Sequence, residues 1–143
     1  MSKLFAISEA VSIAFHSMIM IAASDKRLNV VQISDATGSS RHHVAKVCQR
    51  LVKSDLLYST RGPNGGFKLK KKATDISLMD IYEVLEGVSA SKPCHLENQK
   101  CPFENCLFGD VLDKLAESFI DFLKTNTLDK LVKSTKDKKW QLQ

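Results

Sequence analysis

Long apolar runs are missing from this chain of 143 residues: none approaches the ~20 residues that a membrane-spanning helix needs. The first residues are too few and too mixed in character to form a secretory signal, so we expect a cytoplasmic protein with no membrane partner. The sequence also has no C-x-x-C pair, no Ser–His–Asp or paired-carboxylate arrangement, and no phosphate-binding glycine loop before a helix. These absences predict that the protein is not an enzyme.

The composition is that of an ordinary globular protein, with 43% hydrophobic and 26% charged residues. The net charge of +5 is unevenly distributed along the chain. Residues 1–75 contain twelve Lys and Arg but only five Asp and Glu, whereas residues 76–143 contain nine and eleven. The excess of positive charge in the N-terminal half indicates a polyanionic partner for that half.

The apolar spacing predicts three helices in the N-terminal half. We expect a buried amphipathic helix over residues 6–23, a short helix over residues 30–36 that ends at Gly38, and a helix over residues 40–54 capped by Ser39 or Ser40. Two short helices joined by a glycine-containing turn are typical of a helix-turn-helix. Strand-like residues 56–60 and 67–70 follow and flank a turn-rich segment, so the order is that of a winged helix.

The C-terminal half combines helices with a cysteine-containing loop. Residues 77–87 form a predicted helix, and residues 108–124 carry an apolar stripe typical of a long helix that packs on a second copy of the chain. The predicted fold class is mainly α (α+β), with a winged helix-turn-helix domain and a long C-terminal dimerisation helix. The predicted divisions are residues 1–75 for the DNA-binding domain, 76–133 for the helix, loop and dimerisation helix, and 134–143 for a polar tail.

The third predicted helix leaves basic side chains on its outer face. Arg41, His42 and Lys46 are best placed to contact bases, with His43 beside them, while Arg50 is expected to contact phosphate together with Lys53. Taken alone, such a face is more typical of a solvated surface helix. The predicted hairpin strengthens the case for double-stranded DNA, because an arginine at a hairpin tip can enter the narrow minor groove. The candidate contacts at this tip are Arg61, Gly62, Pro63, Asn64 and Gly65.

Three of the four cysteines are clustered: Cys94, Cys101 and Cys106 are separated by six and four residues. In a reducing compartment, such a cluster is more often a metal site or a redox sensor than a disulfide framework. Thiolates are preferred ligands of iron–sulfur clusters and of zinc, and three free thiols are the alternative. No fourth cysteine is nearby, so His95, Asp110 or a residue elsewhere would complete the site. Taken alone, Cys48 is interpreted as a core residue and His16 as a core or interface residue.

Together, these motifs resemble the IscR- and NsrR-like winged-helix transcription regulators of the Rrf2 family. The resemblance covers about residues 5–133. It rests on the helix pattern at residues 13–23, on residues 61–67 (RGPNGGF, the family's RGPxGG[FY] wing), on residues 77–81 and on the three cysteines before the long helix. It implies a homodimer that presents two winged helices to a palindromic operator, and in many members a 2Fe–2S or 4Fe–4S cluster on the three cysteines.

The resemblance also implies candidate ligands and a mode of action. Cys94, Cys101 and Cys106 would hold the cluster, whose response to redox state, nitric oxide or iron–sulfur status would change DNA affinity, and the regulator would act as a repressor. Gly109 stands where IscR-like members have a ligand histidine, whereas other members use a side chain from the partner's first helix. His16 lies at such a position and is the preferred fourth ligand, ahead of Glu9. A winged-helix regulator with structural zinc or cluster-free thiol sensors is the alternative.

Overall fold

Helix α1 (Glu9–Ala23) is the central element of the fold. It contacts α2, α3, α4, α6 and strand β2, so side chains on several of its faces are buried, including Val11, Ala14 and Met18. The Ser8 hydroxyl caps the helix by accepting a hydrogen bond from the Val11 amide. The helix was predicted to start at residue 6, but Ile7 precedes it and is 51% exposed.

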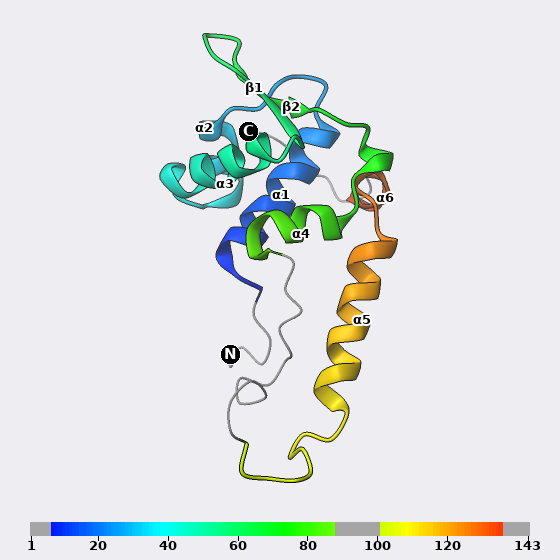
Figure 1. The fold of residues 1–143 in the computed structure, drawn as a ribbon. Coiled ribbons are helices and arrows are strands. Elements are labelled where there is room, and N and C mark those ends of the chain that lie inside the picture. The colour runs from blue at the N-terminus through cyan, green and yellow to red at the C-terminus, as the bar shows by residue number, and fades with distance from the viewer. Residues whose placement is uncertain (1–6, 88–100, 136–143) are drawn as a thin grey trace.

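The structure, a computed structural model, describes residues 7–87 and 101–135. Figure 1 shows the short helices gathered around α1, with the hairpin projecting at one end and helix α5 extending in the opposite direction. In the part of the chain that the structure describes, no helix combines the length and the apolar character that crossing a membrane requires.

Helices α2 (Val30–Thr37) and α3 (Arg41–Lys53) form the predicted helix-turn-helix. Gly38 ends α2 with a φ of 69°, a left-handed conformation that glycine adopts without steric penalty. Ser40 caps α3 by accepting a hydrogen bond from the His43 amide. These two caps fix the short turn, so that α3 packs on α1 through its apolar face and leaves its basic face outside.

Strands β1 (Leu57–Thr60) and β2 (Gly66–Leu69) pair antiparallel and form the hairpin, which we call the wing. The wing is fastened to the helical body because Phe67 and Leu28 exchange backbone hydrogen bonds of 2.7 and 3.3 Å. This pairing requires glycine at residue 66, since a Cβ there would lie 2.6 Å from the Leu28 carbonyl oxygen and the φ of Gly66 is 137°.

In the C-terminal half, α4 and α6 pack on the body and α5 extends away from it (Figure 1). Helix α4 (Leu78–Glu86) follows the 3-10 turn at residues 73–75, and α5 (Val111–Thr125) contacts the body mainly through α4. Helix α6 (Leu128–Thr135), which the sequence analysis did not predict, packs against α1. A backbone bridge between Ser77 and Thr127 ties the start of α4 to the α5–α6 connection.

Candidate nucleic-acid interface and thiol site

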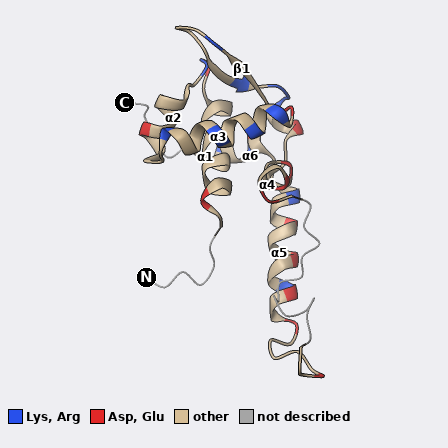
Figure 2. Ribbon diagram, turned by 60° about the vertical axis from the view of Figure 1, so that its left-hand side comes forward, with Lys and Arg blue, Asp and Glu red and all other residues tan. Residues whose placement is uncertain are grey.

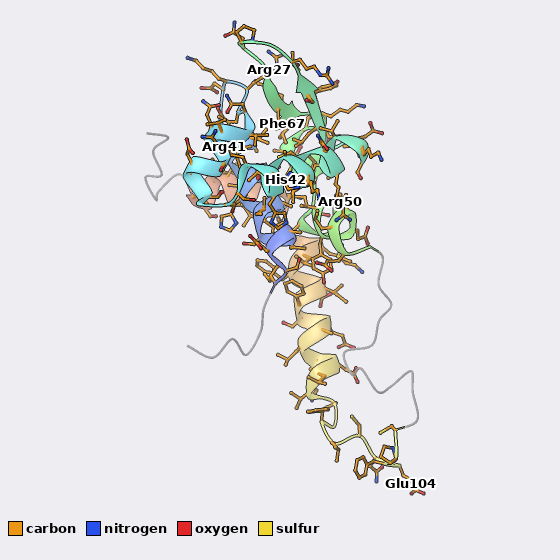
Figure 3. The ribbon with its side chains drawn as sticks, turned by 90° about the vertical axis from the view of Figure 1, so that its left-hand side faces the viewer. Arg27, Arg41, His42, Arg50, Phe67 and Glu104 are labelled. Carbon is orange, nitrogen blue, oxygen red and sulfur yellow. The ribbon has the colours of Figure 1, made fainter. Side chains whose placement is uncertain are left out.

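Three of the predicted base-contacting residues lie together on the exposed side of α3. Arg41, His42 and Lys46 are exposed, whereas Val44, Val47 and Leu51 are buried on the opposite side of the helix. The basic residues of α3 and of the wing lie in the same part of the molecule (Figure 2). Figure 3 shows Arg41 and His42 along α3, on the same side of the body as the wing.

A groove of about 690 Å³ separates α3 from the wing. Lys46 and Gln49 line its α3 side, and Arg61 and Ser59 line its wing side. The fold therefore brings together Lys46 and Arg61, which the sequence analysis assigned to the major and minor grooves respectively. Both side chains belong to exposed residues and no carboxylate lines this groove, so its charge is positive.

A second groove of about 610 Å³ lies between the α1–α2 connection and the wing tip. It brings Lys26, Arg27 and Lys68 beside the tip residues that were predicted to contact DNA, and Figure 3 shows Arg27 beside the wing. The lining tip residues are Pro63, Asn64 and Gly65. Lys26 and Arg27 were missed as candidate DNA contacts, although a basic pair just before a predicted helix N-terminus was a usable signal.

His43 and Arg50 already have partners within the protein. The Nδ1 atom of His43 lies 3.3 Å from Oε1 of Glu9, and His43 is half-buried. The Nη2 atom of Arg50 donates hydrogen bonds to the carbonyl oxygens of Val84 and Leu85, at 2.7 and 3.0 Å. These two side chains thus differ from Arg41, His42 and Lys46, because each of them contacts another helix of the same chain.

Two of the clustered cysteines are at the far end of the molecule from the wing. Cys101 and Cys106 are exposed in the segment before α5, near Glu104 in Figure 3, and form no disulfide with another described cysteine. Cys94 lies outside the described residues. Cys48 is buried in α3, which confirms its interpretation as a core residue, and burial raises the pKa of its thiol from 9.0 to about 12. A thiol held neutral in this way is a poor metal ligand.

His16 is exposed on α1, which excludes the core position and leaves the interface position of its initial interpretation. Its Nδ1 atom lies 2.6 Å from the backbone oxygen of Ser12. A carbonyl oxygen only accepts, so Nδ1 carries the proton and the lone pair of the neutral ring is on Nε2, which is the arrangement of many metal-binding histidines. His16 lines a hollow of about 680 Å³ between α1, the end of α2 and the end of α6.

The described donors fit an iron–sulfur or zinc site in their chemistry but do not meet within one chain. Within residues 7–87 and 101–135, no three His, Cys, Asp or Glu side chains come together as a metal site. Asp110, a candidate for the fourth ligand, instead pairs with Lys114 through a 2.6 Å contact to its ammonium group. Exposed thiols on one copy and an exposed imidazole on another could supply a mixed donor set.

Helix α5 exposes an apolar stripe that a single chain does not cover. Val111, Leu115 and Phe122 are 57%, 43% and 51% exposed, and Leu123 is the only residue of this helix that is buried. The stripe continues into the cysteine-containing segment through Phe103, Leu107 and Phe108, which are also exposed. Contiguous apolar surface of this kind marks an interaction site.

Comparisons with known proteins agree with this geometry. The model of the Rrf2 family, described as an iron-dependent transcriptional regulator, matches residues 7–134. Protein aau3 of Rhizobium meliloti (strain 1021) is 31% identical over 124 residues, which are 85% of this chain and 80% of that protein. The family match covers the helix-turn-helix, the wing and most of the C-terminal half.

Solved structures with the same architecture include two regulators. T. potens IscR superposes with a TM-score of 0.74 at 23% identity, covering 96% of this chain and 94% of its own. CymR, described as the global cysteine regulator of B. subtilis, superposes with a TM-score of 0.70 at 25% identity, covering 92% and 99%. The predicted fold class, mainly α with a small β wing, is confirmed.

Proposed function

The chain belongs to the Rrf2 family of DNA-binding transcription regulators, and from this premise we propose that it is a homodimeric repressor that senses redox state, nitric oxide or iron–sulfur status through an iron–sulfur cluster. It acts in the cytoplasm as a binding protein rather than an enzyme. One observation carries the proposal: exposed thiols and an uncovered apolar helix lie at one end of the molecule, and the basic helix and wing lie at the other.

The apolar stripe of α5 is the dimer contact in this proposal. Val111, Leu115 and Phe122 pack against the same stripe of a second copy, which removes their apolar surface from water. A two-fold dimer presents two recognition helices, so its operator is palindromic and its half-sites are ~34 Å apart. Arg41, His42 and Lys46 read bases in the major groove, and Arg61 enters the minor groove.

The three clustered thiols of one subunit, Cys94, Cys101 and Cys106, hold the cluster together with the partner subunit's His16. The exposed Cys101 and Cys106 and the outward Nε2 of His16 support this ligand set. When bound, the cluster supplies a group that reacts with oxidants and with nitric oxide. Because the ligands come from both subunits, loading ties the cysteine-containing segment to α1, which packs directly on α3. A coupling of about 1–3 kcal/mol would change operator affinity about 5- to 150-fold.

The test is the visible absorption and the iron and sulfide content of protein purified without oxygen. We expect a coloured protein with bound iron and sulfide, loss of both in Cys101→Ala and Cys106→Ala, and a less stable cluster in His16→Ala. Cys48→Ala is the matched control, since it also removes a thiol but one that is buried in α3. It should keep the colour of the wild type.

Loaded and cluster-free protein should then differ in affinity for an operator duplex. Equal affinity would end the sensor proposal and leave DNA binding intact. A colourless protein that takes up no iron and sulfide on reconstitution would contradict the cluster. Stoichiometric zinc would then point to a structural metal, and metal-free protein with oxidation-sensitive binding would point to a thiol sensor.

A further inference from the structure

The C-terminal end of α4 has no cation of its own. Its last turn contains no Lys, Arg or His, and the final carbonyl groups of any helix have no partner within that helix. The guanidinium of Arg50, in the last turn of α3, reaches these carbonyls and donates to the oxygens of Val84 and Leu85, at 2.7 and 3.0 Å. A positive charge at this place also complements the negative end of the helix dipole.

We propose that Arg50 is a positioning residue for DNA recognition, which ties the C-terminal end of the recognition helix α3 to the C-terminal end of α4 and makes no phosphate contact. The inference rests on the DNA-binding function. Arg50 lies at the edge of the groove between α3 and the wing, where a basic side chain would otherwise be expected to meet the DNA backbone. Its Nη2 donors are instead directed at α4.

The position of α4 gives this contact its importance. Helix α4 packs on α1, α3 and α5, and α5 contacts the body mainly through it. The rings of Tyr82 and Phe119 meet edge to face at 5.8 Å between α4 and α5. At the same C-terminal end of α4, the Ser8 hydroxyl donates a 2.5 Å hydrogen bond to Oε1 of Glu86. Arg50 thus provides a polar link between the recognition helix α3 and helix α4, through which α5 contacts the body.

The salt dependence of DNA binding separates a positioning role from a phosphate contact. Each phosphate contact contributes about 0.9 to the slope of log affinity against log salt concentration. The probe is a duplex selected by the wild-type protein from a randomised pool, titrated at several salt concentrations. For Arg50→Gln we expect affinity to fall on the order of 10-fold with the wild-type slope. Lys53→Gln, which removes an exposed charge from the same turn, should make the slope shallower.

A shallower slope in Arg50→Gln, equal to that of Lys53→Gln, would overturn the inference, and so would an unchanged affinity. Hydrogen exchange of the free protein gives a second readout, in which the amides of residues 85–87 should exchange faster in Arg50→Gln than in Lys53→Gln. Equal exchange would contradict the contact. If Arg50→Gln does not fold, Arg50→Lys, which keeps the charge, replaces it in both measurements. If the wild-type protein selects no duplex, DNA binding is refuted. Hydrogen exchange of the free protein would still test whether Arg50 links α3 to α4.

Discussion

Cys48 shows how burial changes the chemistry of a single residue. The thiol lies in the core beside Ser17, whose hydroxyl opposes the effect of burial only in part, so its pKa rises from 9.0 to about 12. Sequence reasoning placed Cys48 in the apolar stripe of a helix and thereby separated it from the three clustered cysteines. The apolar stripe did not predict the size of the pKa shift, because the shift depends on how completely the surrounding helices exclude water.

We predict that Cys48 makes the folded state less stable at high pH. Above pH 9.0 the unfolded thiol loses its proton, whereas the folded thiol keeps it until the pH nears 12, so the unfolded state binds fewer protons and stability falls as the pH rises. The limiting slope is about 1.4 kcal/mol per pH unit. Denaturant unfolding of the wild type and of Cys48→Ala should show a difference in stability that shrinks over this range.

The same burial predicts selective alkylation of the native protein. Cys101 and Cys106 should react with iodoacetamide at neutral pH, because both are exposed, while Cys48 should react only after unfolding. Mass spectrometry of peptides from native and denatured protein measures this directly. Modification of Cys48 at the rate of Cys101 would show that α3 opens readily.

The contacts that His16 and Arg50 make inside the protein could not be predicted from the local sequence. The apolar neighbours of His16 in the sequence suggested a core or interface position, whereas in the structure His16 is exposed and its Nδ1 contacts the carbonyl oxygen of Ser12. Arg50 lies on the basic side of α3, and nothing in its local sequence indicates that α4 ends within its reach. Both outcomes depend on tertiary packing, which local patterns do not contain.

At the scale of elements, the attachment of the wing to the helical body depends on the glycine at residue 66. A side chain at residue 66 would clash with the Leu28 carbonyl and would also have to adopt a φ of 137°. We expect Gly66→Ala to lower the free energy of unfolding by more than the about 1–3 kcal/mol that backbone strain alone causes. Denaturant unfolding gives the value.

Gly62→Ala is the matched control for this prediction. Gly62 also has a positive φ, 107°, but a Cβ at this position would meet no atom within 4 Å. The difference between the two variants isolates the close approach of the wing to the body. Equal destabilisation would mean that the Leu28–Phe67 pairing gives way easily and does not fasten the wing.

Most element types could be predicted because their signals are local. Ser40 and Gly38 bound the helix-turn-helix by capping, and the turn-rich segment between two β-rich runs gave the wing. Helix α6 was not predicted, because its eight residues contain few apolar positions. Its stability comes from the burial of Leu128 and from the backbone bridge at Thr127, which are long-range contacts.

At the scale of the whole molecule, α5 carries apolar surface that its own chain leaves in water. The sequence predicted the apolar stripe but not which part of it the body would cover. In the structure, Leu123 packs into the core and Phe119 contacts Tyr82 while still 37% exposed, whereas Val111, Leu115 and Phe122 are 57%, 43% and 51% exposed. Leu123 and Phe119 attach α5 to the body, and the more exposed residues are the ones that we propose for the dimer contact.

We therefore predict that Leu115→Glu dissociates the dimer. The variant places an unpaired charge in the proposed contact, and a two-fold axis places it there twice, so the dissociation constant should rise on the order of 100-fold. Sedimentation equilibrium measures the constant. Lys124→Glu, an exposed change on the opposite side of α5, should remain dimeric.

The monomeric variant would also separate folding from function. The body is built around α1 and does not need Leu115, so the circular dichroism spectrum of Leu115→Glu should resemble that of the wild type. Operator affinity should fall steeply, because a monomer engages one half-site only. If Leu115→Glu is still dimeric, the dimer contact lies elsewhere in the chain. The exposed stripe of α5 would then be a contact for a partner other than this chain.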